Sequence, residues 1–371
     1  LPDGEFQLKI VRSNDQEYDA SDRQLETIRV SGSYAEPGKH KATFSIGAAS
    51  GQFTLPGVSS YGNAAEPVSD YYVLAVADPD NKIAEADYDD HEEDNTALMT
   101  GLYRTDLNYI IGQGSSAAES FEVTTLDNGD GTSHVKVLMR TPKGNYTVLQ
   151  LVGSNTRVHL RAHGGDDSFA FYAGDVAFAG NLNVQFLGGG GKNTSEMKGL
   201  TARDLIKIHP DNTTMEGVNY SVSATRLSKS QVFGDVSDRV DFYDSRGNDT
   251  FNTYYKEKTD TYSAKMTGAG YVNRVDNMFQ IYAHASGGKD KAKLRGSKHQ
   301  DRLEARPTYT LMQDVDKAFT TYVSNFEKVY AYSNKGPELD EARFWDSSGN
   351  DKFKGTPVFA RLSGPGFYNY A

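Results

Sequence analysis

The octapeptide DSRGNDTF at residues 244–251 returns as DSSGNDKF at residues 346–353, an offset of 346 − 244 = 102 residues. A degenerate copy, GSKHQDRL at residues 296–303, lies midway between them. The chain is therefore organised around a period of about 50 residues, which indicates a repeat array. The two intact copies combine Asp, Asn and Gly, the residue types that close tight turns.

The segments between such turns are short and alternate apolar with polar side chains, as in HVKVLM (134–139), RVHLR (157–161) and KATFSI (41–46). Alternation with a period of two is typical of half-buried β-strands, and helical periodicity is nearly absent. A period of about 50 residues made of strands and turns indicates either propeller blades or the coils of a β-solenoid. Each repeat holds about five short strands, which suits two solenoid coils better than one four-stranded blade. We therefore predict an all-β chain whose residues 121–371 form a right-handed β-helix-like solenoid, continuing or capped beyond the end of the sequence.

Composition excludes several classes of protein. The 371 residues include 50 acidic and 39 basic side chains and no cysteine. The net charge of −11 argues against a nucleic acid or an anionic membrane as partner. The lack of thiols excludes disulfides, thiolate metal sites and thiol nucleophiles, and no apolar run is long enough to insert into a membrane. Because the sequence opens at Leu1 without Met, we expect a processed product or a fragment.

The segment YYVLAVAD at residues 71–78 resembles the closing hairpin of the bacterial cell-adhesion-related domain, an immunoglobulin-like sandwich. The other matching residues are Asn81, Ile83, Glu85 and the segment DNTA at 94–97. This resemblance implies an adhesion-type β-sandwich over residues 1–105, interrupted by a long acidic insert. The following residues, 106–120, are rich in Gly and Ser, and we expect them to form a linker.

The DSxGNDxF repeats, together with GPGFYNYA at residues 364–371, look like the repeats of large secreted or surface proteins of planctomycete-type bacteria. That resemblance implies an extracellular location and assigns no activity. The corners are also similar to the calcium-binding nonapeptide of repeats-in-toxin proteins. Here, however, the copies lie about 50 residues apart instead of nine, and the preceding Gly-Gly-x-Gly is missing.

Two groups of acidic residues are candidates for calcium. Residues 85–94 contain seven carboxylates, and calcium takes six to eight oxygen ligands. The alternative for this run is a solvated hairpin tip. At the repeat corners, Asp244, Asp249, Asp346 and Asp351 either bind calcium or close turns by accepting hydrogen bonds from the backbone. The candidate ligands are Glu85, Asp87, Asp89, Asp90, Asp94, Asp249 and Asp351.

Tyrosine is abundant, with 23 copies. Its ring is apolar and its hydroxyl polar, so a row of tyrosines on one face suits stacking on sugar rings or on a partner protein. The candidate carbohydrate-binding residues are Tyr330, Tyr332, Tyr368 and Tyr370. The alternative is that such tyrosines stack inside the solenoid, because alternate residues of a strand point to opposite faces.

Catalytic motifs are few: the sequence has no His-Glu-x-x-His and no Gly-x-Ser-x-Gly. One enzymatic alternative is a polysaccharide lyase or epimerase acting on anionic glycans, in which a cation neutralises the uronate carboxylate and a base removes the adjacent proton. Its candidate residues are Lys207, His209, Arg226, Tyr282 and His284. The simpler interpretation is that these histidines cap strand ends.

The pattern as a whole favours a non-enzymatic extracellular protein, a structural or adhesive module of a bacterial surface or secreted assembly. We expect a polysaccharide or a surface protein as its partner, and calcium as its only cofactor. An open edge at the C-terminal end of the solenoid would also allow self-association.

Overall fold

A computed structural model describes residues 6–30, 71–77, 79, 95–105, 108–174, 180–315, 319–334 and 339–371. The prediction of an all-β chain is confirmed for these residues, which form strands and no helix. Accordingly, the described part contains no helix that is long and apolar enough to cross a membrane. The acidic run 85–94 and the expected strand 41–46 lie outside the described residues.

Near the N-terminus, four antiparallel strands form a small sheet. Its order is β2 (Arg23–Val30), β1 (Phe6–Ser13), β3 (Tyr72–Ala77) and β4 (Thr96–Leu98). The described strands of the expected immunoglobulin-like region, 1–105, are therefore those of this one sheet and β5 (Gly101–Thr105), which belongs to a larger sheet instead because it pairs with β6 (Tyr109–Gln113).

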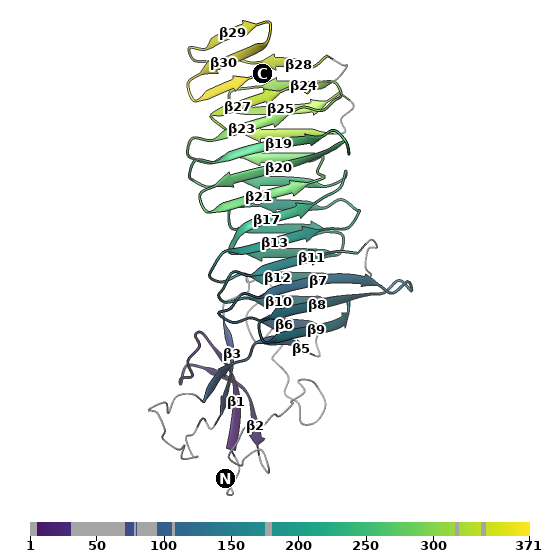
Figure 1. Ribbon diagram of the computed structural model, residues 1–371, viewed down its shortest axis with the longest axis vertical. Helices are drawn as coiled ribbons and strands as arrows, with labels where there is room; N and C mark the ends of the chain where they lie inside the picture. Colours follow the sequence, from purple (N-terminus) through teal and green to yellow (C-terminus); the bar gives the residue numbers. More distant parts are fainter. Residues whose placement is uncertain are drawn as a thin grey trace.

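Two much larger sheets contain the other described strands and stack them along the long axis of the molecule (Figure 1). The order in the 13-stranded sheet is β28 (Glu341–Phe344), β24 (Asp301–Ala305), β25 (Tyr309–Asp314), β26 (Thr320–Ser324), β22 (Gln280–His284), β18 (Arg239–Tyr243), β14 (Leu205–Ile208), β15 (Asn212–Gly217), β16 (Tyr220–Thr225), β12 (Leu182–Leu187), β10 (Thr156–Arg161), β6 (Tyr109–Gln113) and β5 (Gly101–Thr105). The order in the 14-stranded sheet is β29 (Lys352–Thr356), β30 (Phe359–Gly364), β31 (Phe367–Tyr370), β27 (Lys328–Tyr332), β23 (Lys291–Arg295), β19 (Thr250–Lys256), β20 (Thr261–Gly268), β21 (Tyr271–Asp276), β17 (Leu227–Phe233), β13 (Asn193–Lys198), β11 (Ser168–Tyr172), β7 (Ser120–Asp127), β8 (Ser133–Thr141) and β9 (Gly144–Leu151).

The two large sheets pack face to face around one core that extends from Ile110 on β6 to Ala331 on β27. Aromatic side chains cross this core, such as Phe242 on β18 and Phe251 on β19, whose ring centroids lie 5.5 Å apart. The strands that enclose the core alternate buried with half-buried or exposed residues, as period-two patterning requires. The apolar burial that stabilises the fold is therefore continuous from β6 to β27.

The chain passes from one sheet to the other and back, and we call each such passage a coil. Corresponding strands of successive coils pair in parallel, such as β10 with β12 and β23 with β27. Five three-stranded antiparallel meanders interrupt this pattern in the described chain, and they alternate between the sheets. The meanders are β7–β9, β14–β16, β19–β21, β24–β26 and β29–β31.

The three copies of the octapeptide open the last three meanders. The first leads into β19, the degenerate copy into β24 and the last into β29. One repeat is therefore a meander plus two single strands, as in β19 to β23, in agreement with the expected five strands. Each repeat of about 50 residues starts in the sheet opposite to the previous one, so two repeats, or 102 residues between the intact octapeptides, return the chain to the same sheet.

The stretch expected to be a linker, 106–120, differs from that expectation. It contains β6, whose five residues are all buried and which pairs with β5 and β10. The buried side chain of Gln113 also bonds to the backbone N–H and C=O of Val73, at 2.8 and 2.9 Å, and so ties the small sheet to the array. The Gly and Ser residues after β6 form a corner between the two large sheets.

Candidate functional site

The octapeptide corner closes on itself through its serine and its second aspartate. The backbone N–H and the Oγ of Ser245 both donate to Oδ2 of Asp249, at 3.1 and 2.7 Å. The Ser245 Oγ in turn accepts a hydrogen bond from the N–H of Gly247 at 3.0 Å. The same contacts recur between Ser297 and Asp301 and between Ser347 and Asp351. In all three copies the aspartate thus closes a turn, as one of the two alternatives for Asp249 and Asp351 predicted.

A second set of hydrogen bonds joins the corners of successive coils. The N–H of Asp249 donates to Oδ1 of Asp290 at 2.7 Å, and the N–H of Asp290 donates to Oε2 of Glu327 at 2.6 Å. Equivalent bonds link Glu119 to Asp167, Asp204 to Asp238, and Asp301 to Asp340. We call these residues the acidic ladder. Its carboxylates continue the parallel hydrogen bonding of the sheets beyond the strand ends, where backbone N–H groups would otherwise lack acceptors.

Burial changes the acid–base behaviour of the ladder. It raises the pKa of Asp167 and of Asp204 to about 7, and the neighbouring acids Glu119 and Asp238 contribute to these two shifts. Burial also raises the pKa of Asp238 and of Asp301 to about 6. Each of these groups is at most 2% exposed, so water does little to stabilise its charge.

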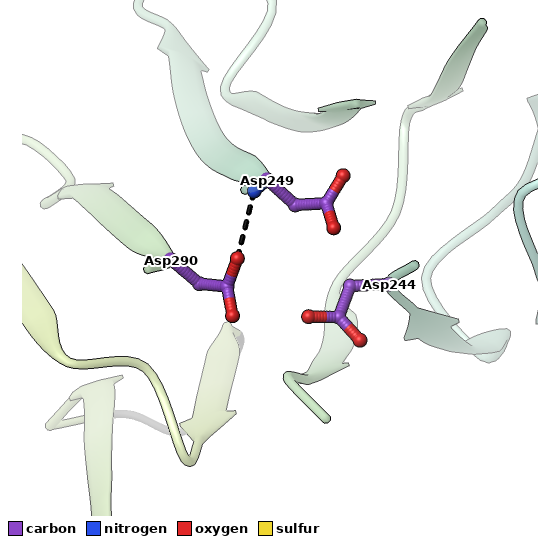
Figure 2. Close-up of side chains that lie close together, drawn as sticks. All are labelled: Asp244, Asp249 and Asp290. Carbon is purple, nitrogen blue, oxygen red and sulfur yellow. Dashed lines mark hydrogen bonds between the residues drawn. The ribbon is translucent and has the colours of Figure 1, made fainter. Parts of the chain in front are cut away.

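Three carboxylates converge at the first intact corner, those of Asp244, Asp249 and Asp290 (Figure 2). Each offers an oxygen, and these oxygens all lie within 4.8 Å of one another. The three side chains are 8%, 1% and 1% exposed. Burial, with the charges of Asp244 and Glu327, raises the pKa of Asp290 to about 7, and burial likewise raises the pKa of Asp244. Of the calcium candidates, Asp249 belongs to this cluster and Asp351 does not.

Asp290 is a residue of this cluster that the octapeptide pattern does not include. It follows two glycines in the segment GGKD (287–290), and Asp167 follows two glycines in the same way in GGDD (164–167). In both segments the second glycine has a positive φ, 118° at Gly288 and 98° at Gly165. The shared Gly-Gly-x-Asp pattern could therefore have located the ladder residues of coils that lack the octapeptide.

The four predicted tyrosines lie together on the outer face of the 14-stranded sheet. Tyr330 and Tyr332 are on β27, and Tyr368 and Tyr370 are on β31. The ring centroid of Tyr330 lies 5.6 Å from that of Tyr368 and 6.0 Å from that of Tyr370. All four are half-buried, whereas Val329, which alternates with them, is buried. The alternative of internal stacking is therefore wrong for these four residues.

Strand register extends this tyrosine cluster into a row of cations. Tyr330 is opposite Lys293 on one side and Tyr370 on the other. From the edge strand β29 through β21, the register places eight outward residues on adjacent strands, which we call the outer row: Lys354, Arg361, Tyr370, Tyr330, Lys293, Asn252, Lys265 and Arg274. Beyond Arg274 the register continues to Gln231 and then to the acid Glu196, where we end the row. Five of the eight are cations and none is an acid, so this line across an acidic protein is positively charged.

An open groove of about 800 Å³ lies at one end of the outer row, over β17, β20 and β21. Four cations line it: Lys229, Lys256, Lys265 and Arg274. Its one lining carboxylate, Asp276, forms ion pairs with Arg274 at 2.6 Å and with Lys256 at 3.0 Å. The groove therefore keeps a net positive charge.

The candidates for the enzymatic alternative lie mostly on the outer face of the other sheet. His209 stacks on Tyr243 at a centroid distance of 4.4 Å, and Tyr243 stacks on His284 at 5.2 Å. Lys207 and Tyr282 flank Asp241 in the same register row. Arg226 does not join them, because it lies at the exposed corner between β16 and β17 with a φ of 58°.

His284 lies between an acid and a hydroxyl. Its Nε2 is 3.3 Å from Oδ1 of Asp241, and its Nδ1 is 3.0 Å from Oγ of Ser324. Burial opposes the charge on Asp241, but hydrogen bonds from His284 and Arg239 outweigh burial and lower its pKa. Since β22 lies between β18 and β26, its backbone N–H and C=O groups form the hydrogen bonds of the sheet.

Comparisons of the chain with protein-family models, with curated proteins and with solved structures found no match. Functional inference for this chain therefore starts from its own geometry.

Proposed function

We propose that the two large sheets form a β-solenoid and that the protein is a non-enzymatic, extracellular structural or adhesive module that binds an anionic polysaccharide along the outer row. The observation that carries this proposal is the continuity of the tyrosine cluster with the row of cations. Tyrosine rings stack on the apolar faces of sugars, and Lys and Arg side chains pair with uronate or sulfate groups.

The dimensions of the outer row suit an extended chain molecule. Adjacent strands of a sheet lie about 4.8 Å apart, so eight adjacent strands span about 34 Å. The five cations occupy the first, second, fifth, seventh and eighth positions of this line, and the two tyrosines occupy the third and fourth. A polysaccharide laid across the strands would present its repeating acidic groups to these cations in turn.

Adhesion would use the remaining parts of the molecule. We propose that β1 to β4 belong to an immunoglobulin-like domain, in line with the resemblance of residues 71–78. β28 and β29 are edge strands of the large sheets, and Phe353 on β29 and the nearby Val358 are 65% and 86% exposed. An exposed apolar sheet edge favours addition of another strand, which supports self-association or docking of a surface protein.

The polysaccharide proposal is tested by titrating the full chain with alginate and with neutral dextran in a calorimeter at low ionic strength. We expect alginate to bind and dextran to bind far more weakly. The double variant Tyr330→Ala/Tyr370→Ala and the variant Lys293→Glu should each weaken alginate binding about tenfold, which corresponds to about 1.4 kcal/mol.

The control for these variants is Lys136→Glu. Lys136 also faces outward on the same sheet, but on β8, far from the outer row in the strand order. Equal loss of binding in Lys136→Glu and Lys293→Glu would show a diffuse charge effect and contradict a defined row. Preferential binding of single-stranded DNA over alginate would replace the polysaccharide with a nucleic acid.

A polysaccharide lyase or epimerase is the second candidate function. It is favoured by one observation, the convergence of His209, Tyr282 and His284 with Lys207 on neighbouring strands of the 13-stranded sheet. Incubation with alginate, pectin and ulvan, followed by ultraviolet absorbance of unsaturated uronate, tests the lyase form. Product formation that is lost in His284→Ala would establish it, and no absorbance change with all three substrates would eliminate it.

A further inference from the structure

The cluster of Asp244, Asp249 and Asp290 joins two coils of the array. Asp244 and Asp249 flank the corner before β19, and Asp290 precedes β23, the neighbouring parallel strand. Figure 2 shows the three carboxyl groups facing a common space, from ribbons that belong to different coils. Because the three groups come from separate positions in the chain, anything bound between them would also link the coils.

Some carboxylate oxygens of the cluster already accept hydrogen bonds from the protein. Asp249 accepts from Ser245 with one oxygen and from the hydroxyl of Tyr271 with the other, at 2.8 Å. Oδ1 of Asp290 accepts the N–H of Asp249, and Oδ1 of Asp244 accepts the N–H and Oγ of Ser286, at 2.9 and 2.7 Å.

Two oxygens of the cluster remain unsatisfied. Oδ2 of Asp244 and Oδ2 of Asp290 are buried and have no hydrogen-bond partner. No described Lys or Arg forms an ion pair with any of the three aspartates. Burying a carboxylate oxygen without a hydrogen-bond donor or a counter-charge costs free energy. A cation bound next to these two oxygens would offset that cost.

We propose that Asp244, Asp249 and Asp290 bind a divalent cation, with Ca²⁺ as the preferred ion. The donor set is made only of carboxylate oxygens, which suits hard cations and not zinc or copper. Three protein ligands leave several positions for water, and Asp249 and Asp290 line a cavity of about 530 Å³ together with Glu327 and three lysines, Lys289, Lys291 and Lys328. Calcium tolerates such an irregular, partly hydrated site better than magnesium, which demands near-octahedral geometry.

The degenerate copy of the octapeptide provides an internal comparison. It keeps Ser297 and Asp301, but Gly296 occupies the position that corresponds to Asp244. The last copy keeps the acid as Asp346, which is exposed. Among the described corners, the buried three-carboxylate arrangement is therefore confined to the first intact copy. The degenerate corner is a natural control that has the turn without the third ligand.

The test uses the full chain, freed of metal with a chelator and dialysed at neutral pH. Calcium chloride should raise its Tm in a saturable manner, and magnesium chloride should have a smaller effect. Asp290→Asn should weaken the response at least tenfold, whereas Asp301→Asn should keep it. Asn is compatible with the fold at this position, because Asn193 is the natural acceptor for the N–H of Asp167 in an earlier coil, at 3.0 Å.

Terbium provides a readout that does not depend on stability. The Tyr271 hydroxyl bonds to Asp249, so terbium at the site should emit on tyrosine excitation, and the emission should fall in Tyr271→Phe and with added calcium. The competing occupant is a proton shared by Asp244 and Asp290. Absence of a calcium response, together with a metal-free Asp290→Asn that is more stable than the parent at neutral pH, would establish the proton and overturn the metal site.

Discussion

The backbone N–H of Asp249 donates to the carboxylate of Asp290, one coil further along the array, at 2.7 Å. This bond connects residues that are 41 positions apart, and it repeats along the acidic ladder with Asp167, Asp238 and Asp340 as acceptors. Buried carboxyl groups therefore join successive coils in addition to the apolar core.

Stability should fall as the pH rises from about 4 to about 7. The folded pKa of Asp167 and of Asp204 is about 7 and that of Asp238 about 6, each above the ordinary value of 3.8. Between these values the folded chain holds protons that the unfolded chain has released, so each group lowers the free energy of unfolding by up to about 1.4 kcal/mol per pH unit. Urea unfolding at pH 5 and pH 8 measures this, and greater stability at pH 8 would contradict it.

Two substitutions of Asp167 distinguish the effect of its charge from the effect of its hydrogen bond to the backbone. Asp167→Asn keeps an oxygen for the N–H of Glu119 and removes the charge, so it should raise the Tm at pH 8 and flatten the pH dependence. Asp167→Ala leaves that buried N–H without an acceptor and should cost about 1–3 kcal/mol at any pH. Thermal unfolding of both variants checks the pair, and equal destabilisation by the two substitutions would show that the charge itself is needed.

Replacing the serine of the octapeptide corner should lower the free energy of unfolding more in the copy where that serine is more deeply buried. Ser297 is 1% exposed, and its Oγ contacts Asp301 and accepts the N–H of His299 at 2.9 Å. Ser297→Ala should therefore cost about 1–2 kcal/mol. Ser347 makes the same contacts in a half-buried corner, and Ser347→Ala should cost about 0.5 kcal/mol or less. The comparison is made by chemical denaturation, and a larger loss from Ser347→Ala would be inconsistent with this account.

Gly288 should not tolerate a side chain. Its φ is 118°, and a Cβ would lie 1.9 Å from the carbonyl oxygen of Gly247 in the preceding coil. Gly288→Ala should therefore cost about 3 kcal/mol or more, because the coils would have to separate. Gly270 also has a positive φ, 81°, but no atom lies within 4 Å of its Cβ position, so Gly270→Ala should cost only about 1 kcal/mol. Similar losses of Tm in the two variants would show that coil contact is unimportant there.

Self-association should depend on the exposed C-terminal edge. Phe353→Lys combined with Val358→Lys places charges on the edge strand β29 and on the turn that follows it, and charged edges discourage strand addition. We expect the double variant to shift any concentration-dependent oligomer toward monomer in light scattering. Leu205→Lys is the matched control, because Leu205 is an exposed apolar residue on β14, which has a neighbouring strand on both sides.

Local patterns predicted much of what the structure contains. Period-two alternation identified strands such as β8 and β10, and the spacing of the octapeptides identified the repeat and its five strands. The prediction of a linker over residues 106–120 was wrong. The Gly and Ser residues that follow Gln113 form a corner between the large sheets, and composition does not distinguish such a corner from a flexible connection.

The sequence by itself determined the strands, the turns and the repeat period, because these depend on residues that are neighbours in the chain. Tertiary structure decided what lies side by side between coils: the alternation of meanders between the sheets, the outer row that joins Tyr330 to Lys293, and the approach of Asp290 to Asp244 and Asp249. These relationships link residues about 40 positions apart through parallel strand register. That register is set by the shared core and by the acidic ladder, and no local pattern of residues specifies it.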